Sequence, residues 1–267
     1  MKRNKSGSWT TVRTGSFRIA PALLLVAGCA STPGAAQSGP KGEVIVMGMI
    51  HGEHRTRPLY GIEVIQDYVR KINPDYILCE IPPDRFETAM DEFRKTGTVA
   101  EPRVRRFPEY VEAIFPLQEE MRFEIIPCAG WTKAMSDDRR EKLEQWTMTR
   151  PLESAEVDRA EKEMDRRLEK EGMEDDPRAI HTDRYDAIIK RGIEPYNRLF
   201  NEDLGPGGWD NINTAHYALI TRALGAHKYE GKRFLITFGA AHKYWFIERL
   251  RKRNDIVLRR PEEFLGE

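Results

Sequence analysis

The sequence predicts an α/β protein: a mainly parallel sheet with helices on both faces and an inserted charged helical region. Three observations lead to this fold class. Short, continuously apolar runs recur along the chain, as in strands that are buried on both faces. Segments with apolar residues at helical spacing separate these runs, and that alternation is typical of parallel sheets. A long, highly charged stretch lies between the third and fourth runs.

Five apolar runs are expected to form the strands. The first ends at Gly48, the second is closed by Pro82-Pro83, and the fourth ends at Gly239. Glycine and proline interrupt regular structure, so they mark where each strand stops. The expected strands are residues 43–48, 76–81, 123–127, 233–239 and 256–258.

Helices are expected between these runs. In segment 59–72, apolar residues recur every three or four positions, and Asn73-Pro74 ends the pattern, as expected for a helix with one buried face. The other helices expected around the sheet are residues 84–95, 108–121 and 241–252.

The charged stretch is expected to be a helical insertion over about residues 132–210 of a single domain that spans 43–267. From residue 137 to residue 176, 24 of 40 residues are charged, and many opposite charges stand three or four positions apart. Such spacing stabilises solvated helices. The apolar residues form one narrow stripe, so the insertion should pack along one line and expose the rest to water. The stripe consists of Val157, Ala160, Met164 and Leu168.

The N-terminal segment differs from the rest of the chain. The 267 residues contain 43 basic and 43 acidic side chains, yet residues 1–28 hold five basic residues and no acidic one. A basic stretch, the apolar run 19–27 and small residues follow one another, which is the layout of a secretory signal. Val26-Ala27-Gly28-Cys29 resembles the lipobox of bacterial lipoproteins. An ordinary secretory signal with an incidental cysteine is the alternative.

These features predict a secreted protein that is anchored to a membrane through lipidated Cys29 and faces the periplasm or the cell exterior. In a host with two membranes, Ala30 after the cysteine favours the outer one. Residues 29–42, rich in Ser, Pro, Gly and Ala, should form a flexible tether. Without residues 1–28 the net charge is −5, so no basic field favours nucleic acid as a partner.

Cys79 and Cys128 both lie at the ends of apolar runs. An oxidising compartment would permit a disulfide between them. Two buried thiols on neighbouring strands are the favoured interpretation.

Two histidines stand three residues after a glycine at a strand end: Gly48 precedes His51, and Gly239 precedes His242. The carboxyl ends of parallel strands open into one crevice, where side chains distant in sequence meet. Glu80 ends the second run, at the same edge of the sheet. Two imidazoles and a carboxylate form a plausible divalent-metal site with an open position for water. We therefore expect a metal ion of unknown identity at this edge.

Proton transfer beside such a metal requires a further group, and His54 and Glu53 are the catalytic candidates because they follow His51 closely. The competing interpretation is structural, since a lone strand-end histidine is more often a hydrogen-bonded residue. In that case Glu80 would pair with Arg55 or Arg57.

Other sequence patterns do not point to a catalytic or binding role. Asn213 is expected to be the N-cap of a helix, and His216 is expected to be a packing residue. The sequence contains neither a Gly-x-x-x-x-Gly-Lys phosphate loop nor a Gly-x-Ser-x-Gly elbow, which argues against a P-loop nucleotide site and a serine hydrolase.

The two Gly-x-x-His motifs and the strand-end Glu80 resemble those of the TraB/Tiki superfamily, whose core is similar to that of erythromycin esterases and of the haem-binding ChaN lipoproteins. The resemblance covers residues 43–81 and 233–258. It implies that His51, Glu80 and His242 occupy the family's active-site positions and that the protein is a metal-dependent peptidase. Erythromycin esterases carry a glutamate where this chain has Gly48, so macrolide ester hydrolysis loses support.

Together these observations predict a metal-dependent, peptidase-like hydrolase at the cell envelope that acts on a small molecule or a peptide. Two alternatives remain open. One is a non-catalytic lipoprotein that binds a ligand such as haem. The other is a structural envelope lipoprotein whose charged helices contact a partner.

Overall fold

The computed structural model describes residues 39–264. The predicted signal peptide, Cys29 and the tether as far as residue 38 lie outside the described residues. The end of the expected tether already belongs to the folded domain, because Pro40 O accepts a hydrogen bond from Gly231 N and Gly42 is the first residue of strand β1.

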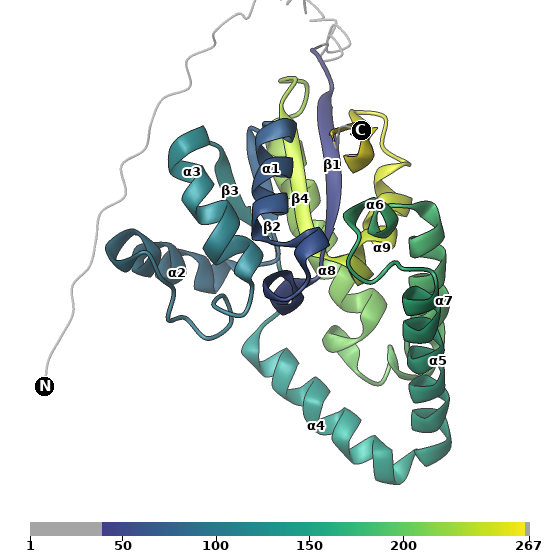
Figure 1. Cartoon of the computed structure of the whole chain (residues 1–267). Helices are drawn as coiled ribbons and strands as arrows, with labels where there is room; N and C mark the ends of the chain where they lie inside the picture. Colours follow the sequence, from purple (N-terminus) through teal and green to yellow (C-terminus); the bar gives the residue numbers. More distant parts are fainter. Residues whose placement is uncertain (1–38, 265–267) are drawn as a thin grey trace, which may run out of the picture. The chain divides into compact units, whose positions relative to one another are not determined.

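Five parallel strands form one sheet in the order β3-β2-β4-β1-β5 (Figure 1). The predicted α/β class is confirmed, and every strand pair is parallel. The predicted second strand was two residues too long, because Glu80 already leaves the sheet. The strands are β1 (Gly42–Met49), β2 (Tyr76–Cys79), β3 (Glu124–Pro127), β4 (Arg233–Gly239) and β5 (Ile256–Arg259).

The chain order creates a switch point between β1 and β4. From β1 the chain crosses to β2 and β3 on one side, and from β4 it crosses to β5 on the other side. Right-handed crossovers in opposite directions place helices on opposite faces of the sheet, as Figure 1 shows with α1 in front and α8 behind. Ligands of such folds bind outside the carboxyl ends of strands at the switch point.

The helices around the sheet match the predicted ones closely. The predicted helix 59–72 begins later, because Pro58–Tyr60 forms a separate 3-10 turn. The predicted helix 108–121 divides into a π-helical turn, Glu109–Ile114, and α3. The helices are α1 (Ile62–Ile72), α2 (Pro83–Thr96), α3 (Phe115–Met121), α8 (Trp209–Ala226) and α9 (Ala240–Leu250).

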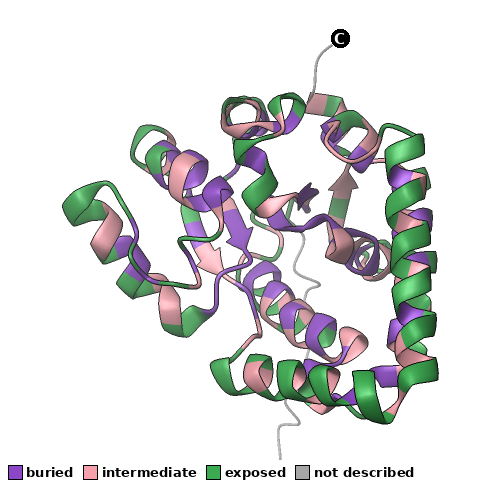
Figure 2. Ribbon diagram, turned by 60° about the horizontal axis from the view of Figure 1, so that its bottom comes forward, coloured by how far each residue is buried: buried purple, intermediate pink, exposed green. Residues whose placement is uncertain are grey.

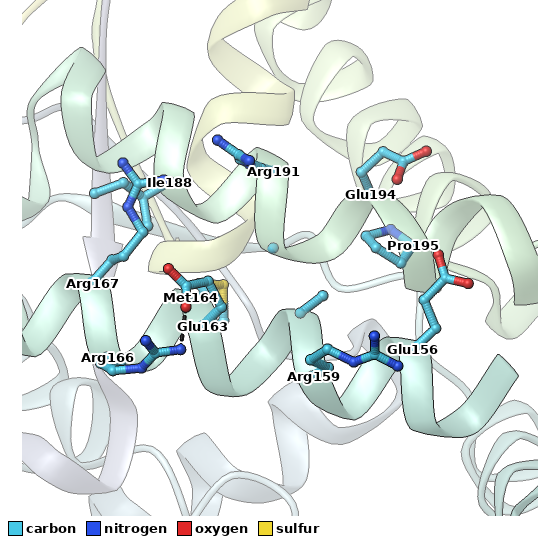
Figure 3. Close-up of a pocket in the computed structure, with 12 residues that line it drawn as sticks. Glu156, Arg159, Glu163, Met164, Arg166, Arg167, Ile188, Arg191, Glu194 and Pro195 are labelled. Atoms are coloured by element: carbon cyan, nitrogen blue, oxygen red, sulfur yellow. Dashed lines mark hydrogen bonds and ion pairs between the residues drawn. The ribbon is translucent and has the colours of Figure 1, made fainter. Parts of the chain in front are cut away.

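The charged insertion is helical, as predicted. Within it, α5 packs on α7, and Figure 3 shows Met164 of α5 between the two helices, with charged side chains such as Arg159 and Arg191 along their groove. Val157 and Leu168 of the predicted stripe are buried. The insertion comprises α4 (Lys133–Thr149), α5 (Pro151–Lys170), α6 (Pro177–Ile180) and α7 (Asp183–Phe200).

The sheet and the insertion differ in how far their residues are buried. The central strands β1, β2 and β4 lie in the buried core, whereas the edge strands β3 and β5 and the outer helices are more exposed (Figure 2). A smaller apolar cluster inside the insertion contains Trp146, Val157, Tyr196, Phe200 and Leu204. No helix within residues 39–264 is both long and apolar enough to cross a bilayer.

Candidate functional site

A crevice of about 500 Å³ opens at the carboxyl ends of β1 and β4, at the switch point of the sheet. His51, Gly239 and His242 line it from the core of the fold. The insertion supplies another wall through Asp165 of α5 and Tyr185 of α7. Both predicted Gly-x-x-His motifs therefore reach one cavity.

Glu80 lies between the two histidines. Its Oε2 is 3.7 Å from His51 Nε2, and its Oε1 is 3.9 Å from His242 Nε2. Gly239 N donates a hydrogen bond of 2.7 Å to Glu80 Oε2. Burial raises the pKa of Glu80, although the charge of His51 and the Gly239 N–H oppose that shift. The three predicted site residues are thus brought together.

A buried glutamate orients His51. His51 Nδ1 donates to Glu109 Oε1 over 2.7 Å, and Glu109 is wholly buried at the start of the π-helical turn. Burial on its own would lower the pKa of His51, but the charges of Glu109 and Glu80 outweigh this effect and raise the pKa to about 9. The other ring nitrogen, Nε2, is directed toward Glu80.

Asn213 orients His242 in the same manner. Asn213 Nδ2 donates to Trp209 O, so its Oδ1 is the atom that accepts from His242 Nδ1 at 2.7 Å. Trp209 stacks on the imidazole at 4.7 Å between ring centroids. Burial lowers the pKa of His242 well below its usual value, so the ring is neutral. A neutral ring that donates from Nδ1 carries its lone pair on Nε2.

The two motif glycines are required by close packing. A Cβ atom at Gly239 would lie 2.6 Å from His51 Nε2, and one at Gly48 would lie 2.8 Å from the Cα atom of Ala240. Both distances are shorter than side chains tolerate. The glycines therefore let the ends of β1 and β4 approach closely enough for the histidines to share Glu80.

Tyr110 fixes the backbone beneath Glu80. Its hydroxyl accepts a hydrogen bond of 2.8 Å from Glu80 N and donates one of 2.7 Å to Thr237 O. Tyr110 follows Glu109 directly, so one buried turn holds both His51 and the Glu80 main chain.

The two candidates for proton transfer differ in position. His54 is buried, its Nε2 accepts from Ile50 N, and its Nδ1 donates to Tyr60 O. Both ring nitrogens are therefore engaged by the backbone, an arrangement that favours a structural role for His54 over the predicted catalytic one. Glu53 lines the crevice and pairs with Arg57 at 3.4 Å.

The structural alternative for Glu80 is wrong. Arg55 pairs with Glu112, and Arg57 pairs with Glu53 and Glu174. Neither arginine is an ion-pair partner of Glu80 in the described part of the chain.

The prediction of Asn213 as an N-cap is also wrong. Helix α8 begins at Trp209, with Gly208 at its N-cap, so Asn213 lies one turn inside the helix and is fully buried. His216 is buried as expected, and its Nδ1 accepts from Gly130 N.

Among residues 39–264, no group of three or more His, Cys, Asp or Glu side chains stands ready to hold a metal ion. Atoms bound to one zinc ion at tetrahedral geometry lie about 3.4 Å apart. The distance from His51 Nε2 to Glu80 Oε2 is 3.7 Å and that from His242 Nε2 to Glu80 Oε1 is 3.9 Å, so both exceed that spacing. The donor set of two imidazoles and one carboxylate fits a divalent metal, and each imidazole has the outer hydrogen bond that is typical of metal-bound histidine.

The cysteines lie apart from this chemistry. Cys79 and Cys128 are buried free thiols, and Cys128 N donates to Cys79 O across neighbouring chain segments. The prediction of two buried thiols is confirmed. Burial raises the pKa of Cys79 to about 12, which suppresses the reactive thiolate.

Comparison with known proteins yields no relative on which to base a function. No family model, no curated protein and no solved structure matches the chain. A function is therefore inferred from the geometry of the site.

Proposed function

We propose that the chain is a metal-dependent, peptidase-like hydrolase that acts at the cell envelope. The observation that carries the proposal is the convergence of two imidazole Nε2 atoms on one buried carboxylate, with each Nδ1 atom held from outside. Groups with this arrangement are typical of catalytic metal sites with an open position. The resemblance of the Gly-x-x-His motifs to TraB/Tiki proteins supports the same activity.

His51, Glu80 and His242 would hold the ion, which when bound supplies Lewis acidity and an activated water at neutral pH. Glu109 and Asn213 hold the Nδ1 atoms of the two histidines, so that each Nε2 is already directed at Glu80. Little reorganisation of the side chains would therefore be needed when the metal binds. Because the pKa of His51 is raised to about 9 in the metal-free protein, its Nε2 must lose a proton before it can act as a ligand. Metal affinity should therefore increase with pH.

Glu53 would move the proton at the crevice. Its side chain is more than half exposed and lines the cavity beside His51. A carboxylate in that position can accept a proton from an attacking water and pass it to a leaving amine.

The crevice favours this function over haem binding. Glu53, Asp165 and Glu174 bring three carboxylates to the lining, against the guanidinium of Arg57 and the His51 ring, whose raised pKa keeps it cationic in the metal-free protein. A haem carries anionic propionates, which such a lining would repel. The insertion also lines the crevice, which supports a role at the site more than a purely structural one.

The location at the envelope rests on the sequence of residues 1–29 alone. Mass spectrometry of the protein purified from a bacterial membrane fraction tests it. A diacylated N-terminal Cys29 is expected; an intact Met1 or an unmodified cysteine would contradict it.

The activity is tested with the purified full chain and a pool of synthetic peptides, followed by mass spectrometry. Cleavage is expected to stop on chelation, to return with added Zn²⁺, and to be absent in His51→Ala and His242→Ala. His227→Ala is the matched control, because His227 pairs with Glu230 and stacks on Tyr76 away from the crevice. Equal cleavage by all three variants would refute the proposal.

A further inference from the structure

The insertion contributes directly to the crevice. Asp165 and Leu168 of α5 and Tyr185 of α7 line the same cavity as His51 and His242. The other side of α5, which includes Glu163, faces the groove toward α7 (Figure 3). One helix of the insertion therefore places different side chains on the crevice and on the outer groove.

The rim of the crevice carries an excess of negative charge. Arg57 lies 3.4 Å from Glu53 and 3.8 Å from Glu174, so two carboxylates already compensate its single charge. Asp165 is exposed and makes no ion pair or hydrogen bond with any residue in the range 39–264. Among the described residues, no cation therefore pairs with the Asp165 carboxylate at the rim.

An apolar surface lies next to that carboxylate. Leu168 stands one turn after Asp165 on α5, and Tyr185 lines the cavity as well. Lysine and arginine side chains combine an aliphatic stem with a cationic end. Their stem fits against such a wall while the charge reaches the carboxylate.

We propose that Asp165 is a specificity-determining residue and that the substrate is a peptide with a lysine or arginine side chain next to the cleaved bond. The proposal rests on the proposed function in one respect, namely that this crevice is the substrate site. The acidic rim would attract the cationic side chain, and the peptide carbonyl would be placed toward His51 and His242, which line the same crevice.

The test uses the full chain, freed of metal by chelation, and three blocked pentapeptides: acetyl-Ala-Ala-Lys-Ala-Ala-amide and its Nε-acetyl-lysine and glutamate counterparts. Isothermal titration calorimetry should show the lysine peptide binding roughly five-fold more tightly than the acetyl-lysine peptide. Asp165→Asn should reduce that ratio about three-fold, and 0.5 M salt should reduce it in the wild type by screening.

Glu163→Gln is the matched control. It removes the same charge from the same helix, but from the groove side, and it should leave the ratio unchanged. Equal affinities for the three peptides, absence of binding, or an effect of Glu163→Gln as large as that of Asp165→Asn would each overturn the proposal.

The two proposals fail in different ways. Charge preference in binding without any metal-dependent cleavage would remove the hydrolase function and leave the specificity of the crevice standing. Metal-dependent cleavage at the same rate with and without lysine acetylation would support the hydrolase function and refute the proposed specificity.

Discussion

Asn213 Oδ1 accepts the Nδ1 proton of His242 at 2.7 Å and thereby directs the other ring nitrogen at Glu80. The amide cannot reverse its orientation without losing the bond from its Nδ2 to Trp209 O. This contact determines which nitrogen of His242 is available as a ligand.

Substitution of Asn213 should therefore weaken metal binding without removing a ligand. Asn213→Leu is expected to lower zinc affinity roughly ten- to hundred-fold, as loss of an outer hydrogen bond does in other metal sites. Asn213→Asp retains a hydrogen-bond acceptor for His242 Nδ1, so its zinc affinity should decrease much less. Competition with a chromogenic chelator measures both values, and equal losses in the two variants would argue against the orienting role.

The His51–Glu109 contact predicts a pH-dependent stability of the metal-free protein. The folded pKa of His51, about 9, lies above the ordinary value of 6.5, so the contribution is fully present below pH 6.5 and is lost as the pH rises from 6.5 to 9. A third of the His51 side chain is exposed to the crevice, and solvent screening will keep the effect modest.

Urea unfolding of the wild type and of Glu109→Gln across pH 6–10 tests this. The difference in unfolding free energy between them should shrink as the pH rises through that window. A difference that stays constant with pH would mean that His51 does not carry the expected proton.

Gly239→Ala should displace the His51 ring, because the new methyl group would lie 2.6 Å from Nε2. We expect loss of metal binding together with a destabilisation of about 1–3 kcal/mol, as for other overpacked sites. Gly225→Ala is the control, since nothing lies within 4 Å of the added atom. Wild-type metal affinity in Gly239→Ala would show that the close contact is not required.

The buried ion pair between Lys243 and Asp186 joins α9 to α7 of the insertion. Lys243 is almost fully buried, so Asp186→Ala would leave an uncompensated charge and should cost about 3–5 kcal/mol. The double variant Asp186→Leu with Lys243→Leu should recover part of that loss. Denaturant unfolding measures both, and a single variant as stable as the wild type would contradict the assignment.

The sequence was sufficient to predict the site residues that stand directly after a strand. His51, Glu80 and His242 each follow an apolar run, and parallel strands bring their carboxyl ends to one edge. The glycines of the two motifs were visible for the same reason, although their steric function appears only where β1 and β4 pair.

The residues that orient the site could not be predicted in this way. Glu109 lies 58 residues from His51, and Asn213 lies 29 residues from His242. Their contacts depend on how a π-helical turn and α8 pack on the sheet. An acidic residue within the apolar run from Phe107 to Val111 was the available signal for Glu109.

The sequence also does not show that the rings of His51 and His54 point in different directions. His51 has a positive φ of 52° and begins a 3-10 turn, His51–Arg55. The ring of His51 faces the crevice, whereas that of His54 enters the protein interior. This backbone conformation is unusual for a residue other than glycine, and spacing alone does not reveal it.

We propose that His51, Glu80 and His242 bind one divalent ion together. The decisive measurement is the zinc content after equilibrium dialysis, determined by inductively coupled plasma mass spectrometry. About one zinc per wild-type chain is expected, and almost none in His51→Ala, Glu80→Ala and His242→Ala, with His227→Ala as the wild-type-like control. A wild-type chain without zinc, or variants that retain it in full, would show that the three side chains do not form a metal site.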